Sequence, residues 1–385
     1  MDYIPRRLQA PLQEVAGQFP VVLVTGPRQA GKSTLLQHCF PGYRYITLDD
    51  PLVRSLAVSD PALFLKTHEP PLILDEIQYA PALLSYIKMY VDAHRREHGQ
   101  YLLTGSQIFP LMKGVSESLA GRVAILQLYP LSWKECPSID IYDEQEVAKQ
   151  MLRGFYPELQ IQPQMNPKFW YSAYLSTYLE RDLRAMRNIQ DLGQFQKYLV
   201  LLAARAGQLF NLQEISKECG ISQTTAKDWL TLLQATSIVY LLEPYANNLT
   251  KRVIKSPKLF FIDTGLLCYL LRIEDAEQLI YSPFGGHVFE NMVIMEQVKR
   301  FAERGERAPC YFYRTREGVE IDLVIDLGGR FAAHEIKFTS TPTSEMTRSL
   351  LEFKSEHPTE RCSLWTLRKE RLPFSNGIIA EHWSQ

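Results

Sequence analysis

The sequence predicts an α/β fold: a parallel sheet with helices on both faces, then a helical part, then a small second α/β domain. The length of 385 residues corresponds to two or three domains of ordinary size. In the first third, short apolar runs alternate with stretches long enough for crossover helices, and strands of this kind are typical of parallel sheets covered on both sides. The expected strands are residues 21–26, 43–48, 71–74, 101–103 and 123–128.

The composition excludes several classes of protein. Apolar residues make up 46% of the chain and charged residues 22%, which excludes a disordered, collagen-like or coiled-coil chain. The net charge is −1, so a nucleic-acid partner would need a local basic patch. The six Cys are scattered without a Cys-x-x-Cys pair, which fits a reducing compartment. No run approaches the ~20 apolar residues of a membrane helix. We therefore expect a cytoplasmic protein that has no membrane partner.

A phosphate-binding motif follows the first expected strand. The residues are Gly26-Pro27-Arg28-Gln29-Ala30-Gly31-Lys32-Ser33, followed by Thr34, and they match G-x-x-x-x-G-K-[ST]. Gly26 and Gly31 allow the backbone to curl around phosphate oxygens. Lys32 neutralises the β- and γ-phosphates, and the Ser33 hydroxyl ligates Mg²⁺. The sequence therefore predicts that residues 26–34 bind a nucleotide with Mg²⁺.

Two carboxylates end the third expected strand. Asp75 lies where it can hold Mg²⁺, and Glu76 lies where it can orient and deprotonate a water. GTPase-type chains lack the second acid, so Glu76 favours hydrolysis of ATP. A surface acid pair at the end of a strand is the alternative, but the preceding phosphate loop makes it weak.

Two later positions are candidates for contacts with the nucleotide. After the fourth strand, either Thr104 or Ser106 could contact the γ-phosphate or the attacking water, in the role called sensor 1. Simple turn chemistry is the alternative for this pair. Arg122 precedes the last strand and could act in trans, as an arginine finger that reaches the nucleotide of a neighbouring subunit. A solvated surface Arg is the alternative there.

A helix-turn-helix pattern lies in the middle of the chain. Residues 212–222 suggest a helix and a Gly-containing turn, and a second helix follows over 223–234, with Ser222 as its cap. A strand at 238–242 and a turn at 247–248 suggest a wing, so residues that face outward could reach a DNA groove. Packing on a neighbouring subunit is the alternative. The outward residues are Gln223, Thr224, Thr225 and Lys227, and a basic run follows with Lys251, Arg252, Lys255 and Lys258.

The last third predicts a second acidic site. An amphipathic helix is expected from residue 287 to about 304, with Glu290 on it. Asp322 and Glu335 then lie on two strands that Gly328-Gly329 could join, and Lys337 shares a strand face with Glu335. Asp322 and Glu335 could hold Mg²⁺, with Lys337 beside them. An amphipathic strand pair with alternating charges is one alternative, and a nuclease-like fold without cleavage is another.

The motifs together resemble a known family. In chain order, the phosphate loop, residues 74–76 (Leu-Asp-Glu), 103–106 (Leu-Thr-Gly-Ser) and 119–122 (Leu-Ala-Gly-Arg) are similar to prokaryotic AAA-type ATPases paired with a DUF4143 domain. Stretches at 154–158, 178–183, 255–258 and 261–265 resemble that second domain. The C-terminal acidic set is similar to the PD-(D/E)XK nuclease pattern, although Ile321 replaces the Pro of the Pro-Asp pair. The resemblance implies ATP use and assembly into a homo-oligomeric ring.

These observations predict four parts. They are a P-loop ATPase domain (1–135), a helical lid or connector (136–192), a winged-helix domain (193–262) and a nuclease-like domain (263–385). The expected function is hydrolysis of ATP with Mg²⁺ by a ring protein whose C-terminal half engages nucleic acid, with DNA favoured. The alternative is a signalling or scaffold ATPase whose C-terminal modules bind protein and do not cleave DNA.

Overall fold

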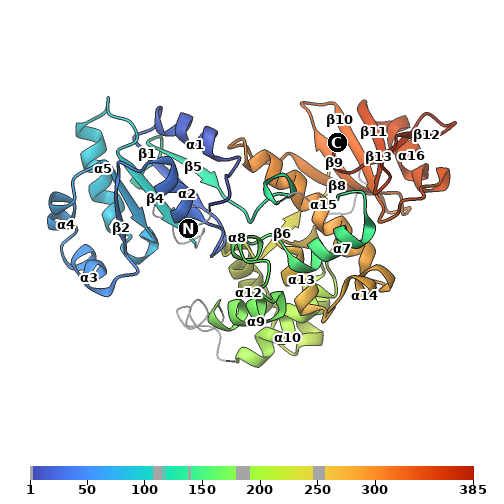
Figure 1. Cartoon of the computed structure of the whole chain (residues 1–385), viewed down its shortest axis with the longest axis horizontal. Coiled ribbons are helices and arrows are strands. Elements are labelled where there is room, and N and C mark those ends of the chain that lie inside the picture. Colours follow the sequence, from blue (N-terminus) through green and yellow to red (C-terminus); the bar gives the residue numbers. More distant parts are fainter. Residues whose placement is uncertain (1–2, 107–114, 116–117, 138–139, 179–190, 246–255) are drawn as a thin grey trace.

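The computed structural model describes residues 3–106, 115, 118–137, 140–178, 191–245 and 256–385. Two lobes are visible in Figure 1. The N-terminal lobe contains the first sheet, and the larger lobe contains the middle helices and the C-terminal sheet. Among the helices of the described ranges, none is both long enough and apolar enough to cross a membrane.

The first sheet confirms the predicted parallel architecture. It contains β1 (Val21–Thr25), β2 (Arg44–Thr47), β3 (Leu72–Asp75), β4 (Tyr101–Gly105) and β5 (Val123–Gln127) in the order β2-β3-β4-β1-β5, and every pairing is parallel. The carboxyl ends of β1, β3 and β4 therefore meet at one edge of the sheet. This edge brings together the motifs that follow these strands.

Helices cover both faces of this sheet. On one face, α1 (Gln9–Ala16) and α2 (Lys32–Cys39) pack on alternate residues of β1 and on β4. On the other face, α4 (Pro61–Thr67) and α5 (Leu83–Ala93) pack on the remaining residues of the same strands. The helix α3 (Pro51–Ser59) precedes α4. Because both faces are buried at the centre of the sheet, β1, β3 and β4 are buried along their whole length and largely apolar, as the sequence predicts. The edge strands β2 and β5 are partly exposed.

The middle of the chain is mainly helical and contains the predicted helix-turn-helix. Its helices are α7 (Glu144–Arg153), α8 (Pro157–Ile161), α9 (Pro167–Tyr178), α10 (Leu192–Ala203), α11 (Leu212–Cys219), α12 (Gln223–Ala235), α13 (Thr264–Leu270) and α14 (Ala276–Tyr281). Gly220, at φ 77°, ends α11, and the Ser222 hydroxyl caps α12 by accepting from the Thr225 amide at 3.0 Å. Strands β6 (Val239–Leu242) and β7 (Lys258–Phe261) form an antiparallel pair.

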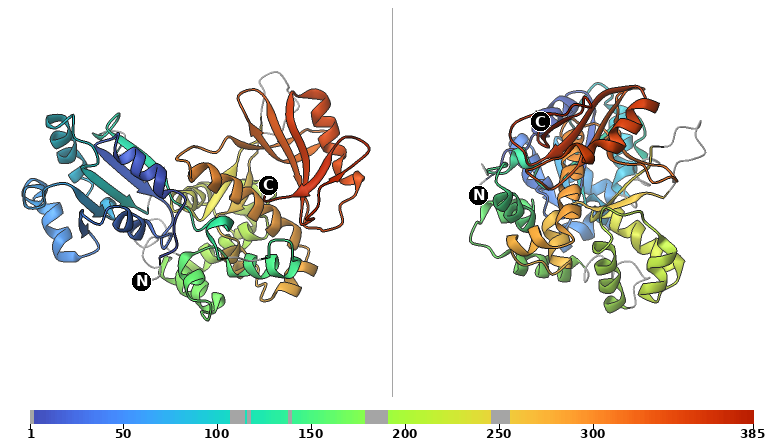
Figure 2. Two further views of the ribbon diagram at one scale, coloured as in Figure 1. Left: turned by 45° about the horizontal axis from the view of Figure 1, so that its top comes forward. Right: turned by 90° about the vertical axis from the view of Figure 1, so that its right-hand side faces the viewer.

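The C-terminal sheet is mixed and lies between two helices. Its order is β12-β13-β11-β10-β9-β8, with β8 (Cys310–Arg314), β9 (Glu320–Asp326), β10 (Phe331–Ile336), β11 (Thr359–Thr366), β12 (Leu372–Pro373) and β13 (Ile379–His382). The helix α16 (Arg348–Glu356) packs on one face, and α15 (Gly285–Ala302) packs on the other. The sheet and α15 lie together in both views of Figure 2. Gly328 and Gly329, both at positive φ, form the predicted turn between β9 and β10.

The helix α15 corrects one expectation of the sequence. The sequence predicts an amphipathic helix over residues 287–304, but α15 is buried on nearly all sides, polar residues such as Glu290 and Glu296 included. One hydrophobic core explains this burial, because it extends from Tyr129 to Trp383 and surrounds α15 with residues of both the middle region and the C-terminal sheet. The ring of Trp133, for example, lies 5.2 Å from that of Trp383. The boundaries at 135, 192 and 262 stay predictions.

Candidate functional site

The phosphate loop connects β1 to α2 and requires both of its glycines. Gly26 has φ 144°, and a Cβ there would lie 1.9 Å from the carbonyl oxygen of Leu128. Gly31 has φ 90° and is the N-cap residue immediately before α2. Both conformations favour glycine over residues that carry a side chain. The loop can therefore curl as the motif predicts, with the N-terminus of α2 directed at its centre.

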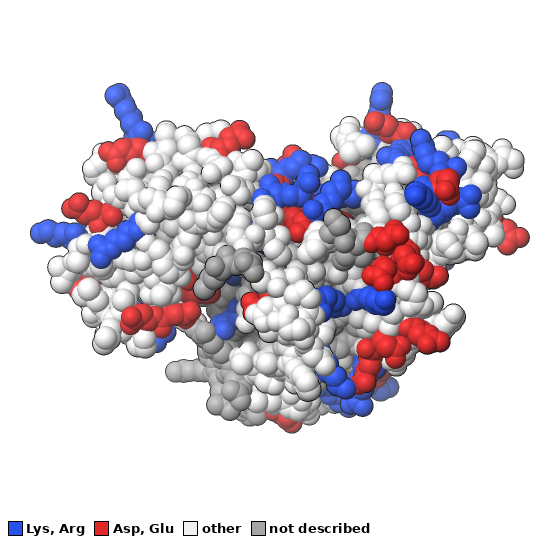
Figure 3. Space-filling view, in the orientation of Figure 1, with Lys and Arg blue, Asp and Glu red and all other residues white. Residues whose placement is uncertain are grey.

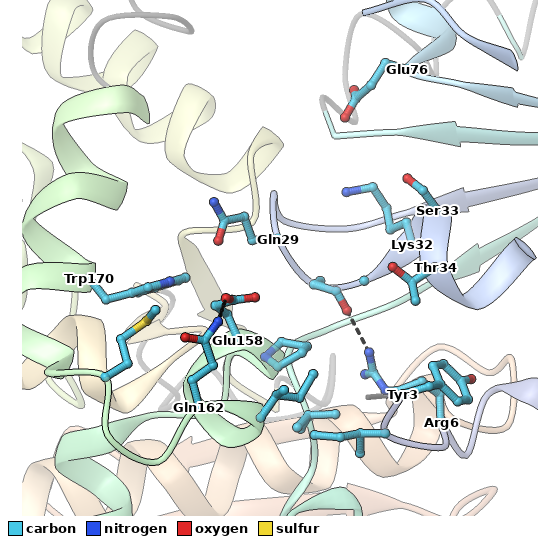
Figure 4. A pocket seen from close by; sticks show the side chains of 17 residues that line it. Tyr3, Arg6, Gln29, Lys32, Ser33, Thr34, Glu76, Glu158, Gln162 and Trp170 are labelled. Carbon is cyan, nitrogen blue, oxygen red and sulfur yellow. Dashed lines mark hydrogen bonds between the residues drawn. The ribbon is translucent and has the colours of Figure 1, made fainter. Parts of the chain in front are cut away.

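Lys32 lies within the curl of this loop. Its Nζ donates to the carbonyl oxygens of Gly26 (3.1 Å) and Pro27 (2.8 Å), and only 5% of the residue is exposed. Burial lowers the pKa of this ammonium below its usual value. In Figure 4, Lys32 and Glu76 face the same pocket from the side of the first sheet. A phosphate group entering the loop would offer the ammonium a stronger acceptor than a carbonyl.

Asp75 is held by hydroxyl groups from three elements. Its Oδ1 accepts from Ser33 (2.6 Å) and Thr104 (2.5 Å), and its Oδ2 accepts from Tyr45 (2.7 Å). A carboxylate beside a hydroxyl is the hard oxygen donor set that suits Mg²⁺ bound with nucleotide phosphates. The residues present therefore fit the predicted Mg²⁺ pair of Ser33 and Asp75.

Glu76 adopts a left-handed backbone conformation and is held by two side chains. Its φ is 57°, which is uncommon for a residue other than glycine and is concentrated at functional sites. Ser106 Oγ donates to Glu76 Oε2 at 3.1 Å, and Gln78 Nε2 donates both to the same oxygen and to Ser106. Thr104 instead contacts Asp75 and accepts from the Glu76 amide. Of the two sensor 1 candidates, Ser106 is thus the one whose hydroxyl faces the carboxylate of Glu76.

Arg6 is a site residue that sequence reasoning missed. Its guanidinium donates to the carbonyl oxygens of Ala30 in the phosphate loop and Tyr129 after β5, each at 2.7 Å. Its Nε also lies 3.2 Å from Glu135 Oε2, and both side chains are almost fully buried. A single Arg ahead of the first strand belongs to no motif, so only the folded chain identifies this contact.

A pocket of about 800 Å³ opens beside the phosphate loop, between the first sheet and helices α8 and α9. Apolar side chains from several elements line one part of it: Ile4, Leu131, Ile161, Met165 and Trp170. Polar side chains line the remainder: Arg6, Gln29, Thr34, Glu158 and Gln162. In Figure 4, Trp170 and Gln162 lie across the pocket from Lys32. This volume and mixed lining suit a ligand that has a flat apolar part and an anionic part.

Arg122 lies at the opposite edge of the first sheet from the phosphate loop. It immediately precedes Val123, which pairs with Val21 at the start of β1, so the length of β1 (about 16 Å) separates it from Gly26. Its Nε donates to Asp92 Oδ1 at 2.7 Å. Arg122 therefore does not reach the nucleotide pocket of its own chain, and a role in trans stays a prediction.

The four C-terminal residues that the sequence singled out converge on one pocket of about 440 Å³. Lys337 Nζ donates to Asp322 Oδ2 (3.1 Å) and Glu335 Oε2 (2.9 Å). Lys258 Nζ donates to Glu290 Oε1 (3.1 Å) and lies 3.8 Å from Asp322 Oδ1. The carboxylates of Asp322 and Glu335 therefore point to the same side of the sheet.

The position of Lys258 corrects another expectation. The sequence placed it in an exposed basic run beside the wing, but only 2% of the residue is exposed, and it pairs with Glu290 and with Glu320 at 2.6 Å. A buried ammonium needs such partners because burial of an unpaired charge is costly. Three other members of the run lie outside the described residues: Lys251, Arg252 and Lys255. The turn expected at 247–248 and residues 179–183 lie outside them as well.

Burial and the ammonium groups of Lys258 and Lys337 shift the pKa values of the carboxyls in this pocket in opposite directions. Burial alone would raise the pKa of Asp322, but Lys337 and Lys258 outweigh it and lower that pKa to about 2. Burial raises the pKa of Glu290 to about 7 despite the nearby Lys258. Burial and the charge of Asp322 raise the pKa of Glu335 well above its usual range. Carboxyls with divergent pKa values in one pocket are typical of functional sites.

Asp322 and Glu335, the predicted metal ligands of the C-terminal pocket, do not form a complete metal site by themselves. Within the described ranges, no group of three or more His, Cys, Asp or Glu side chains is arranged to hold a metal ion. Asp322 and Glu335 supply two carboxylates, and the ammonium of Lys337 lies within hydrogen-bonding distance of both. The donor set of these residues therefore does not fit a metal ion without further ligands.

The residues predicted to face outward from α12 are mostly exposed. Gln223, Thr224 and Lys227 are exposed at the start of α12, and Thr225 is half-buried, with its amide donating to the capping hydroxyl of Ser222. On the face seen in Figure 3, Lys and Arg side chains gather in the notch between the lobes, and acidic side chains gather on the larger lobe. Charge is thus separated locally although the net charge is near zero.

Comparison with known proteins gives three family matches along the chain. An AAA domain matches residues 18–136, a domain of unknown function (DUF8612) matches 144–277, and a second domain of unknown function (DUF4143) matches 285–384. The stretches at 154–158, 178–183, 255–258 and 261–265, which the sequence analysis assigned to DUF4143, thus fall in the DUF8612 match. The DUF4143 match instead covers α15 and the C-terminal sheet.

Relatives extend over most of the chain. The uncharacterized protein Rv2008c of Mycobacterium tuberculosis is 32% identical over 97% of this chain and 82% of its own length. The uncharacterized protein MJ1544 of Methanocaldococcus jannaschii is 23% identical over 79% of this chain and 72% of its own. Among solved structures, the Walker-type ATPase PABY2304 of Pyrococcus abyssi has a TM-score of 0.48 and 15% identity, over 70% of this chain and 96% of that chain. From its domain matches and its relatives, the chain belongs to the family of P-loop ATPases of the AAA type that carry a C-terminal DUF4143 domain.

Proposed function

We propose that the chain binds ATP with Mg²⁺ in the pocket beside the phosphate loop and hydrolyses it there. One observation carries this proposal: Ser33, Asp75, Glu76 and Ser106 meet where β1, β3 and β4 end, beside Lys32. When bound, Mg²⁺ would neutralise phosphate charge, and Ser33 and Asp75 are the residues that would hold it. Glu76 would orient and deprotonate the attacking water, and Ser106 would hold Glu76 toward it.

The apolar part of the pocket suits the base of the nucleotide. Trp170 offers a flat ring, and Ile161 and Met165 also line the pocket. Gln162 and Glu158, which hydrogen-bond to each other, offer polar groups to the edge of a base. Because Arg6 ties the carbonyl of Ala30 to the segment after β5, the loop and the base pocket would keep a fixed spacing.

Three substitutions test the ATPase proposal. Lys32→Ala should remove most of the affinity for ATP, and Glu76→Gln should keep ATP binding but lower turnover by about 10²- to 10⁴-fold, the usual contribution of a general base. Glu97→Gln is the matched control, since this carboxylate is exposed and does not line the pocket. Turnover by Glu76→Gln near the unmutated rate would overturn the assignment of the base.

We further propose that the C-terminal half engages nucleic acid, with DNA favoured. The convergence of Glu290, Asp322, Glu335 and Lys337 in an open pocket supports a site for a phosphodiester, since Lys337 is 40% exposed there. The exposed start of α12 supports contact through the helix-turn-helix. Cleavage of the bound DNA is a second, more specific claim of this proposal.

Two DNA measurements separate this proposal from a protein-binding scaffold. Affinity for duplex DNA should fall with salt, and the log-log slope should drop by about 0.9 for each phosphate contact removed by substitution. Cleavage of plasmid or linear DNA in Mg²⁺, with or without ATP, by the wild type and not by Asp322→Asn would support the nuclease part of the proposal. Salt-independent or absent DNA binding would favour the signalling or scaffold alternative. DNA binding without cleavage would support the proposed DNA contact and overturn the proposed nuclease activity.

A further inference from the structure

Tyr45 lies beside the ATPase site although it belongs to none of the motifs. It is on β2, which pairs in parallel with β3 so that Thr47, two residues later, lies level with Asp75. Residues two apart on a strand share a face, and the tyrosine ring is long enough to lean along the strand toward Asp75. The side chain is 37% exposed, so it is a rim residue rather than part of the core.

The hydroxyl of Tyr45 contacts the oxygen of Asp75 that does not accept from Ser33 or Thr104. Ser33 and Thr104 both donate to Oδ1, whereas Tyr45 donates to Oδ2 at 2.7 Å. The hydroxyl therefore acts as a donor to the carboxylate.

We propose that Tyr45 is a positioning residue for the Mg²⁺-dependent reaction, because it fixes the second oxygen of Asp75 and thereby the plane of that carboxylate. This inference rests on the proposed ATPase function and on the pairing of Ser33 with Asp75. Mg²⁺ requires near-ideal octahedral geometry, so it is sensitive to the orientation of a carboxylate near it. Tyr45 acts through Asp75 and is not a catalytic residue.

The two hydroxyls that donate to Oδ1 do not by themselves fix the orientation of the Asp75 carboxylate. Hydrogen bonds to one oxygen leave a carboxylate free to turn about its Cβ–Cγ bond, whereas a donor on each oxygen fixes both ends. Ser33 could keep donating to Oδ1 while its lone pairs face the ion. Tyr45 would hold Oδ2 both with and without a bound Mg²⁺. The loss of its hydroxyl should therefore weaken the Mg²⁺-dependent part of nucleotide binding and leave the phosphate loop unaffected.

Tyr45→Phe tests this inference, with Tyr86→Phe as the matched control, since Tyr86 is also 37% exposed and lies on α5. Calorimetric titration with ATP, in EDTA and in Mg²⁺, separates the two parts of binding. In EDTA, we expect equal affinities for the wild type and both variants. In Mg²⁺, Tyr45→Phe should bind about five- to tenfold more weakly, as expected for a lost hydrogen bond to a charged group at a partly exposed site. The Mg²⁺ concentration for half-maximal hydrolysis should rise by a similar factor.

A double-mutant cycle with Asp75→Asn completes the test. If Tyr45 acts through the Asp75 carboxylate, Tyr45→Phe should have no further effect on binding in the Asp75→Asn background. Equal Mg²⁺ dependence of Tyr45→Phe and the wild type would overturn the inference. So would an equal loss of affinity in EDTA and in Mg²⁺, which would indicate a loosened pocket. A wild type that binds no ATP, or binds it without any gain from Mg²⁺, would instead overturn the proposed function itself.

Discussion

Replacement of Arg6 by Met should destabilise the protein strongly, because this guanidinium joins three buried groups. It donates to the carbonyl oxygens of Ala30 and Tyr129 and pairs with Glu135, whose side chain is 2% exposed. Met keeps the length of the aliphatic stem but removes every donor. Loss of one partner of a buried ion pair costs about 3–5 kcal/mol. Glu135 keeps the amide donors of Arg7 (2.6 Å) and Ser132 (2.9 Å), so we expect a loss of about 3 kcal/mol in the free energy of unfolding.

Urea unfolding of four proteins tests this value: the wild type, Arg6→Met, Glu135→Gln and the double mutant. The double mutant should cost less than the sum of the single mutants, with a coupling of about 1–3 kcal/mol. Arg7→Met is the matched control, because its guanidinium is 53% exposed and its ion pair with Glu303 should contribute at most about 1 kcal/mol. A loss below about 1 kcal/mol for Arg6→Met, or strict additivity with Glu135→Gln, would refute the reasoning.

Three further predictions concern other parts of the chain. Subunits with Arg122→Ala, mixed with Lys32→Ala subunits, should regain some ATP hydrolysis if Arg122 acts in trans, and no rescue in a confirmed assembly would favour a surface Arg. Gly26→Ala should abolish ATP binding, because the added Cβ would meet the carbonyl after β5 at 1.9 Å, and an unchanged affinity in calorimetry would show that the loop adjusts. Glu290 has a folded-state pKa of about 7 against a usual value near 4.5, so its contribution to stability is greatest below pH 4.5 and is lost as pH rises to 7. Urea midpoints at pH 5 and 7.5 should therefore differ less in Glu290→Gln than in the wild type, and an equal difference would contradict the shift.

Much of the ATPase lobe could be predicted from the sequence, because its chemistry is local. The apolar runs predicted five parallel strands, and all five are present at nearly the expected bounds. The phosphate loop places its glycines, Lys32 and Ser33 within eight consecutive residues, so their spacing alone predicts the site. Asp75 and Glu76 are adjacent at the end of a strand, and such ends meet at one edge of a parallel sheet. Gly220 and Ser222 likewise indicated the turn before α12 through local backbone and capping chemistry.

Contacts between distant segments were decided only by the tertiary structure. Arg6 and Glu135 are 129 residues apart, and no motif predicts that they meet beneath the phosphate loop. Tyr45 reaches Asp75 because β2 is the neighbour of β3 in the sheet. Lys258, which composition placed on a basic surface, lies instead in the acidic pocket because β7 packs against α15. The sequence therefore determined the chemistry that is carried by adjacent residues. The fold determined which charges are buried together, because burial and pairing depend on contacts between segments that are far apart along the chain.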